Sequence, residues 1–340
     1  MNGLAVSTLP FLQALADGRN DILTKFMNLV TYLGDEKLFV LIALVVFWCF
    51  SKQGGLYMLT VGFGASSIGQ TLKSVFRVPR PWNLGDQTFG GADPIARGTE
   101  KMGGLLGKIT GALGTGADGW SFPSGHTLIS VGTYGGMARW FRSKGARIIG
   151  ILLAVLIPFS RLYLGVHTVV DVICGAIISL ILVLALYPVF ARGSRNAVRG
   201  VLIGNIALSA VTLGIVYLLK PNGLEGEDIG NYASGVKNLW QLIGATAALE
   251  IGFEADERWL HFETKAVWWA QALKVLGGAV IVLALQLGIQ KLLGYSSKEL
   301  TLENMTRMGI IACFANLVAI GAATALWPKT FRWFSGLGRK

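Results

Sequence analysis

The amino-acid sequence predicts an all-α membrane protein, a polytopic helical bundle with about nine transmembrane helices. Hydrophobic residues make up 53% of the 340 residues and charged residues only 14%, whereas soluble domains carry about 25% charged residues. Apolar stretches of roughly 20 residues, the length that spans about 30 Å of hydrocarbon, recur along the chain. So few charges cannot cover a water-exposed surface, which excludes a disordered chain, a coiled coil and an ordinary soluble domain.

The predicted spans follow an amphipathic N-terminal segment and occupy most of the remaining chain. The chain is expected to divide into this segment at 1–35, a core at 36–191 and additional C-terminal helices at 192–340. The first span is short, and the seventh is interrupted by Glu250. The nine predicted spans are 36–51, 55–76, 125–142, 146–164, 168–191, 199–219, 236–253, 267–290 and 308–327.

The N-terminal segment 1–35 mixes Leu, Phe and Val with charged residues between Asp17 and Lys25. This pattern is typical of helices that lie in the membrane interface. Ala14-Leu15-Ala16 resembles a signal-peptide cleavage site, but no Lys or Arg precedes it. An uncleaved surface helix is therefore expected rather than a signal peptide.

Basic loops set the expected orientation, because loops rich in Lys and Arg stay on the cytoplasmic side. The N-terminus is then outside, the C-terminus is cytoplasmic, and the loops 77–124 and 161–167 are both outside. This topology also accounts for the net charge of +11, so no nucleic-acid partner is expected. The basic residues that support it are Arg139, Arg142, Lys144, Arg147, Arg192, Arg195, Arg199, Lys329, Arg332, Arg339 and Lys340.

The outer loop 82–121 holds eleven glycines. A loop of this length is usually functional or disordered, and we expect a mobile lid over a site. Its stretch from Leu105 to Leu113 is expected to rest on the membrane surface.

One polar pair, His167 and Asp171, lies at the start of a predicted helix. Residues four apart share one face of a helix, so the carboxylate can accept a hydrogen bond from one imidazole nitrogen. That bond sets the tautomer and leaves the other nitrogen free as a nucleophile or base. The same pair would also suit simple helix capping.

A second polar group lies in the other outer loop, at Pro123-Ser124-Gly125-His126. A helix N-terminus offers free N–H groups to an oxyanion, glycine allows close backbone approach, and serine can cap the helix. His126, in the first turn, is placed to protonate a leaving group. A capped helix with no ligand is the alternative.

Three cations, Lys73, Arg80 and Arg161, lie at predicted helix ends on the same side of the membrane. Guanidinium groups bind phosphate oxygens bidentately, although each side chain alone could simply extend to the interface. Cations, helix N–H groups and two histidines together favour phosphoryl transfer. No cluster of Asp, His and Glu has metal-ligand spacing, so metal-independent chemistry with no cofactor is predicted.

The three motifs Lys73-x6-Arg80-Pro81, Pro123-Ser124-Gly125-His126 and Ser160-Arg161-x5-His167-x3-Asp171 occur in this order. Together they resemble the signature of the type 2 phosphatidic acid phosphatase superfamily, over roughly residues 55–190. The resemblance implies a helical membrane phosphatase that works through a phosphohistidine intermediate, with its phosphatase core inside 36–191.

The resemblance also implies a role for each motif residue. His167 would be the nucleophile, Asp171 would orient it, and His126 would be the general acid. The residues that would hold the phosphoryl oxygens are Lys73, Arg80, Ser124, Gly125 and Arg161.

A lipid phosphate monoester or diphosphate, entering sideways from the membrane, is the expected substrate. The compounds considered are phosphatidate, phosphatidylglycerol phosphate, a polyprenyl diphosphate and a sphingoid-base phosphate. A phosphotransferase would use the same intermediate with another acceptor. The nine-helix layout resembles that of glucose-6-phosphatase, so a soluble sugar phosphate is an alternative, although the motif neighbourhoods resemble bacterial and sphingoid-phosphate branches at least as much.

Two other function classes stay open at this point. A transporter of a phosphorylated solute would fit the helices and the cations, and the intramembrane Glu250 is the main feature that favours it. Against it, the cations lie at one membrane face, whereas transporter sites lie near the midplane. A catalytically inactive relative that only binds lipid is the other class, but the intact histidines argue against it.

The short loops and the absence of a targeting signal favour a bacterial plasma membrane. The oligomeric state is left open.

Overall fold

The computed structural model describes residues 1–84, 119–221, 223–296 and 300–336. Within these ranges every regular element is helical and there is no strand, which confirms the predicted all-α class. The predicted lid, 82–121, and its surface stretch 105–113 lie outside the described residues, apart from the two ends of the lid. Nothing further about that lid follows from the structure.

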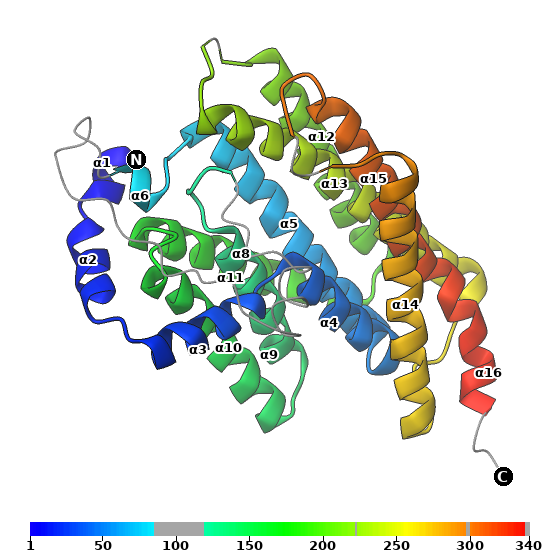
Figure 1. Ribbon diagram of the computed structural model, residues 1–340. Coiled ribbons are helices and arrows are strands. Elements are labelled where there is room, and N and C mark those ends of the chain that lie inside the picture. The colour runs from blue at the N-terminus through cyan, green and yellow to red at the C-terminus, as the bar shows by residue number, and fades with distance from the viewer. Residues whose placement is uncertain (85–118, 222, 297–299, 337–340) are drawn as a thin grey trace. The chain divides into compact units, whose positions relative to one another are not determined.

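Within each described range, the helices follow one another through short connections (Figure 1). The first part of the chain forms α1 (Asn2–Val6), α2 (Leu9–Asp17), α3 (Asp21–Tyr32), α4 (Glu36–Cys49), α5 (Lys52–Phe76) and α6 (Pro81–Leu84). After residue 118 come α8 (Gly125–Ser130), the π-helix η2 (Val131–Gly135), α9 (Gly136–Trp140), α10 (Lys144–Tyr163) and α11 (Val169–Arg192). The remaining elements are α12 (Arg195–Leu218), α13 (Glu227–Ala255), η3 (Asp256–Leu260), α14 (Trp268–Leu292), α15 (Met305–Gly321), η4 (Ala322–Leu326), η5 (Trp327–Thr330) and α16 (Phe331–Gly336).

The chain forms two compact units that interleave in sequence. The first unit comprises Met1–Val40 and Ile68–Ala185, and the second comprises Leu41–Ser67 and Leu186–Lys340. Helices α4, α5 and α11 each contribute residues to both units. Each unit is described here by itself.

In the first unit, α10 is the element around which the others pack. It contacts α2, α3, α8, η2 and α9, and Figure 1 shows α3 and α9 beside it. The side chain of Asn20 caps α3 by accepting a hydrogen bond from the backbone N–H of Leu23 at 2.9 Å. Such a cap satisfies one of the free N–H groups at a helix start, so α3 begins at a defined residue.

The N-terminal helices are amphipathic, as the sequence predicts, but their inner face packs within the protein. Leu9 and Leu12 of α2 form a buried cluster with Val78 and Phe122, which flank the predicted site residues. The outer side of α3 leaves Ile22 84% exposed. Residues 1–35 therefore cover the part of the first unit that holds the motif loops, with apolar side chains left outside.

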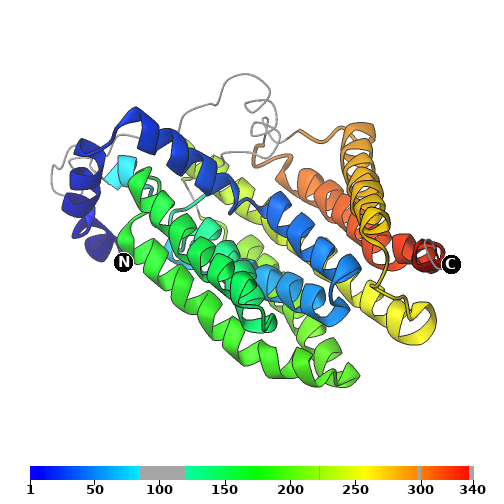
Figure 2. The same cartoon turned by 90° about the horizontal axis from the view of Figure 1, so that it is seen from below.

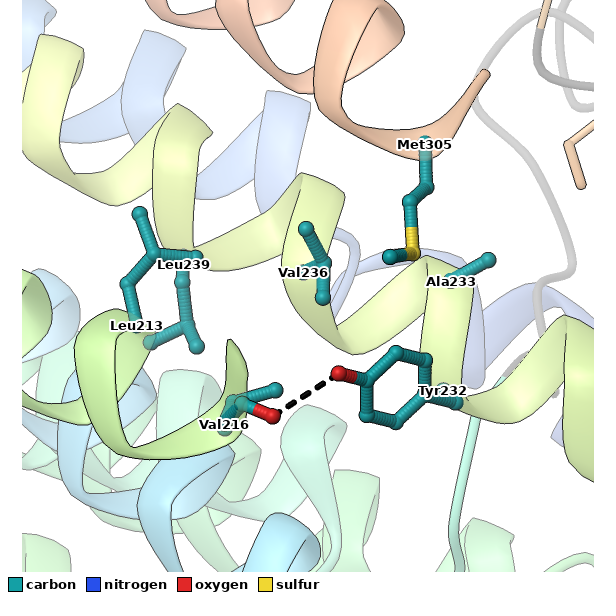
Figure 3. Packing of buried hydrophobic residues seen from close by; sticks show 7 residues of the cluster. All are labelled: Leu213, Val216, Tyr232, Ala233, Val236, Leu239 and Met305. Carbon is teal, nitrogen blue, oxygen red and sulfur yellow. Dashed lines mark hydrogen bonds between the residues drawn. The ribbon is translucent and has the colours of Figure 1, made fainter. Parts of the chain in front are cut away.

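In the second unit, α13 packs closely along α15, and α12 and α14 flank this pair (Figures 1 and 2). Figure 3 shows the buried cluster where α12, α13 and α15 meet, in which the Tyr232 hydroxyl donates to the Val216 carbonyl at 2.8 Å. A Cβ on Gly244 would lie only 2.1 Å from the Cys313 carbonyl oxygen. Small residues permit this kind of backbone approach between membrane helices.

Five stretches in the described residues are long and apolar enough to cross a membrane: α10, α11, α12, α14 and Met305–Gly336. The other four predicted spans fall on helical segments that do not meet this criterion. Helix α4 has only 14 residues, and the span predicted at 125–142 is divided among α8, η2 and α9. Helix α5 is rich in Gly and Ser, and α13 carries several charged residues. The structure thus supports a membrane helical bundle, while the predicted count of nine is not reached.

Replacing Gly244 by alanine tests the close contact between α13 and α15. The added methyl group meets backbone atoms of Cys313 that cannot rotate away, and such overpacking costs about 1–3 kcal/mol. We expect a lower unfolding midpoint for the detergent-solubilised protein, measured by thermal denaturation.

Gly235→Ala in the same helix is the matched control, because a Cβ there meets no atom within 4 Å. Alanine favours a helix over glycine by roughly 0.5–1 kcal/mol, so this variant should keep or slightly raise the midpoint. Equal midpoints for the two variants would contradict the close contact.

Candidate active site

All eight site residues predicted from the sequence belong to the first unit. They come from segments that are far apart in the sequence. Lys73 lies in the last turn of α5 and Arg80 directly before α6, while Arg161 lies near the end of α10. Ser124, Gly125 and His126 form the start of α8, His167 lies in the connection after α10, and Asp171 is in the first turn of α11.

His167 and Asp171 are both buried and face each other, with 3.4 Å between Nδ1 and Oδ2. Arg80 Nη1 lies 2.9 Å from His167 Nε2 and 3.4 Å from Nδ1. A guanidinium can only donate hydrogen bonds, so the shorter contact favours Nε2 as the acceptor and places the ring proton on Nδ1, toward Asp171. This is the tautomer that the predicted pairing requires, and it leaves the Nε2 lone pair directed toward a cation.

Ser121 lies beside this pair, although none of the three sequence motifs contains it. Its hydroxyl donates to Asp171 Oδ2 at 2.5 Å and lies 3.4 Å from His167 Nδ1. The backbone N–H of Thr168 donates to the same oxygen at 2.7 Å. Asp171 is therefore held by two donors besides its contact with His167. The serine comes three residues before Ser124, a position that by itself does not indicate which carboxylate it meets.

The cations are partly satisfied by backbone carbonyls. Lys73 donates to the Trp120 carbonyl, and Arg80 donates to the carbonyls of Gly119 and Val166 at 3.0 and 2.9 Å. These contacts hold the positive groups beside the loop that carries His167. They do not neutralise the charges, because a carbonyl is a dipole and not an anion.

Arg161 is fully buried and only partly bonded. Its Nη1 donates to the Thr31 hydroxyl at 2.7 Å, whereas Nε and Nη2 find no hydrogen-bond partner among the described residues. Buried donors without partners cost free energy and are uncommon in proteins. Nε and Nη2 lie on the same edge of the planar group, the edge that binds a phosphate or carboxylate bidentately. An anion is the partner that this edge fits.

The surroundings of His167 favour its neutral form. Burial lowers the pKa of the imidazole well below its usual value of 6.5, and the positive charges of Arg80, Arg161 and Lys73 lower the pKa further, with a smaller effect of His126. A neutral ring keeps a lone pair on Nε2, which a nucleophile needs. These electrostatic effects mean that the three cations and His126 lie near His167.

The start of α8 is tied to the start of α11. Ser124 Oγ accepts hydrogen bonds from the backbone N–H of Thr127 at 3.4 Å and from its hydroxyl at 3.0 Å, so it caps α8 as predicted. The Ser124 N–H donates to the Asp171 carbonyl at 3.1 Å. A Cβ on Gly125 would meet no atom within 4 Å, which leaves open space in front of this helix start.

Glu250, which favoured a transporter, lies in the second unit. Its Oε1 accepts from Nε of Arg199 at 2.9 Å, and neighbouring Glu254 pairs with Arg195 and Arg258. The ion pairs made by Arg195 and Arg199 join α12 to α13. Among the described residues, no group of three or more His, Cys, Asp and Glu side chains could hold a metal ion.

Comparison with known proteins adds two family matches and two relatives. Residues 54–195 match the family model described as PAP2 superfamily, and residues 240–339 match the one described as PAP2 superfamily phosphatase, transmembrane extension. No solved structure matches the chain significantly.

The undecaprenyl-diphosphatase of Sulfolobus acidocaldarius is 46% identical over 56 residues, which is 16% of this chain and 27% of the relative. The probable sphingosine-1-phosphate phosphatase of Dictyostelium discoideum is 26% identical over 196 residues, 52% of this chain and 41% of the relative. The chain thus spans less than half the length of either relative. Because the first family match contains all eight site residues and the second covers most of the C-terminal helices, the chain belongs to the PAP2 superfamily.

Proposed function

We propose that this protein is an integral-membrane phosphatase that hydrolyses a phosphate monoester or diphosphate of a lipid, without a metal ion. The observation that carries the proposal is the buried His167, whose Nε2 faces Arg80 near an Arg161 with two nitrogens that have no partner among the described residues. A neutral nucleophile next to cations whose hydrogen-bonding groups are only partly satisfied suits the attack of nitrogen on phosphorus.

In the first step, His167 Nε2 attacks phosphorus, so an N–P bond forms and the P–O bond to the lipid breaks. His126 donates a proton to the leaving oxygen. Arg80 Nη1 moves from Nε2 to a phosphoryl oxygen, and Lys73 and Arg161 stabilise the remaining negative charge of the transition state. Asp171 accepts from Nδ1–H and stabilises the positive charge of the phosphorylated ring.

In the second step, water attacks the phosphohistidine. His126 takes a proton from this water, the N–P bond breaks, and inorganic phosphate leaves. His167 returns to its neutral form with Nε2 again free. Every proton given to the lipid alkoxide in the first step is recovered from water in the second, so the site needs no other reactant.

A lipid is proposed as the substrate because both relatives are named for lipid phosphates. The apolar outer faces of the helices support it: Ile148, Leu152 and Val155 of α10 are all more than half exposed. We also propose nine membrane crossings in a bacterial plasma membrane, with the site and the N-terminus outside and the C-terminus in the cytoplasm. The alternating positions of the basic loops support this orientation.

The transporter alternative loses its main support, because Glu250 is paired with Arg199. A soluble sugar phosphate and a lipid phosphate carry the same phosphoryl group and differ in the group attached to it. Comparing the reaction rates of substrates with and without an apolar chain therefore distinguishes the two alternatives.

His167→Ala should abolish phosphate release, because it removes the nitrogen that forms the N–P bond in the proposed mechanism. The purified protein in detergent would be assayed with EDTA present, using phosphatidate, a polyprenyl diphosphate and a sphingoid-base phosphate. His261→Ala, the exposed histidine of the second unit, is the matched control and should keep full activity. Activity that is lost with EDTA, or that survives in His167→Ala, would contradict the mechanism.

Substrate chain length should strongly affect the reaction. For a lipid substrate, kcat/KM in mixed micelles should rise at least tenfold from a short-chain to a long-chain phosphatidate, while glucose 6-phosphate should be turned over poorly. Comparable kcat/KM values for glucose 6-phosphate and the long-chain lipid would favour the sugar phosphate reading instead.

The pH profile should report the low pKa of His167. Activity requires neutral His167, so the acid limb of kcat/KM should lie below pH 6.5. Arg80→Gln removes a positive charge and should move this limb to higher pH, on top of a lower maximal rate. Arg77→Gln, whose parent side chain donates to the Ser74 carbonyl, should leave the limb in place. An acid limb unmoved by Arg80→Gln would show that another group controls it.

A further inference from the structure

We propose that helix α3 and the turn after it form part of the catalytic site, with Thr31 positioning the guanidinium of Arg161 for the phosphoryl group. The proposal rests on the proposed function and extends the site to a segment outside the family match at 54–195. The sequence analysis assigned this segment only to the membrane interface.

The contact that carries the proposal is a buried hydrogen bond. The Thr31 hydroxyl accepts from Arg161 Nη1 at 2.7 Å, and its side chain is almost fully buried at 2% exposure. Nη1 is thereby occupied, which leaves the edge formed by Nε and Nη2 for a ligand. A guanidinium is planar, so one hydrogen bond at Nη1 restricts the direction in which the opposite edge points.

Helix α3 is held firmly enough to act as a support. Arg19, which precedes it, donates from Nε to the Tyr163 carbonyl at 2.8 Å, and the Thr24 hydroxyl lies 3.2 Å from the Tyr163 hydroxyl. Met27 packs in a buried cluster with Tyr163 and with Val166, the residue directly before His167. One face of α3 is therefore fastened to the segment that connects Arg161 to His167.

The turn after α3 approaches the general acid as well. A Cβ on Gly34 would lie only 2.6 Å from Ile157 Cγ2, so a larger residue would displace that side chain, and it would lie 3.4 Å from His126 Cδ2. The next residue, Asp35, is buried and interacts electrostatically with Arg161. Asp35 Oδ1 also accepts from the Lys37 N–H at 2.9 Å, which anchors the carboxyl group at the start of α4. The N-terminal segment thus contacts Arg161 through Thr31 and borders His126 through the turn at Gly34.

Thr31→Val removes the hydroxyl and keeps the shape of the side chain. If the hydroxyl positions Arg161, this variant should lower kcat/KM at least tenfold, mainly through kcat, and weaken inhibition by orthovanadate by a similar factor. Thr31→Ser keeps the hydroxyl, so its kcat/KM should stay within about twofold of the wild type. The tenfold loss expected for Thr31→Val corresponds to about 1.4 kcal/mol. The unfolding midpoint of each variant is measured in parallel.

Thr24→Val is the matched control, because it also removes a buried α3 hydroxyl that contacts α10 but does not touch Arg161. It should leave orthovanadate inhibition unchanged, because Arg19 and Met27 still hold α3 against Tyr163. In an Arg161→Lys background, Thr31→Val should have little further effect, because lysine has no Nη1 to hold. Non-additivity of this kind identifies residues that act through one another.

Three results would overturn the proposal: wild-type kcat/KM in Thr31→Val, equal losses in Thr31→Val and Thr24→Val, or losses that multiply in the double variant with Arg161→Lys. Direct titration of the protein with orthovanadate separates this proposal from the proposed function. If the wild type binds orthovanadate but hydrolyses no lipid phosphate, the proposed function fails. Weaker orthovanadate binding by Thr31→Val would then still support the positioning role.

Discussion

Repulsion among Lys73, Arg80 and Arg161 is the constraint on which the arrangement of the first unit depends. Burying like charges together is unfavourable unless dipoles, opposite charges or a ligand compensate them. The described residues provide backbone carbonyls for Lys73 and Arg80, and a hydroxyl and a nearby carboxylate for Arg161. This compensation is incomplete, and in the proposed function a phosphoryl group supplies the remaining negative charge. Cations that are already held together before the substrate arrives would then bind more strongly as negative charge develops in the transition state.

Asp171 is the acidic residue of the proposed site, and two donors fix one of its carboxyl oxygens beside His167. Ser121 and the Thr168 N–H both donate to its Oδ2, and the backbone of Asp171 accepts from Ser124. The start of α8, the start of α11 and the loop before α8 are therefore linked through one residue. A change at Asp171 disturbs both the nucleophile and the helix that carries His126.

The second unit is stabilised by different interactions. Glycines at contacts between α13 and α15 allow backbone approach, and ion pairs between α12 and α13 satisfy the charged residues at one end of these helices. Lys274 of α14 is fully buried and donates to the carbonyls of Trp48 and Thr264. None of the eight predicted site residues lies in this unit. Its apolar outer surface suits a membrane setting, as the match to a transmembrane extension also indicates.

Much of the fold class and of the site was predictable from the sequence, because both rest on local patterns. Composition and the length of the apolar stretches determined an all-α membrane protein. The i, i+4 spacing of His167 and Asp171 indicated that the two side chains meet, although His167 lies two residues before α11 and not in the helix. Ser124 caps α8 as its position before the helix indicates. The three motifs already contained every residue now placed in the catalytic steps.

Other features depend on contacts between distant segments, which no local pattern encodes. Thr31 meets Arg161 across 130 residues of chain, Ser121 meets Asp171 across 50, and Arg199 meets Glu250 across 51. An amphipathic pattern showed that α3 has an apolar face, but not whether lipid or protein covers it. Packing of α3 against α10 decided that question, because the buried face of a helix is set by its neighbours. Tertiary structure thereby placed the N-terminal segment beside the two residues, Arg161 and His126, that the motifs had already marked.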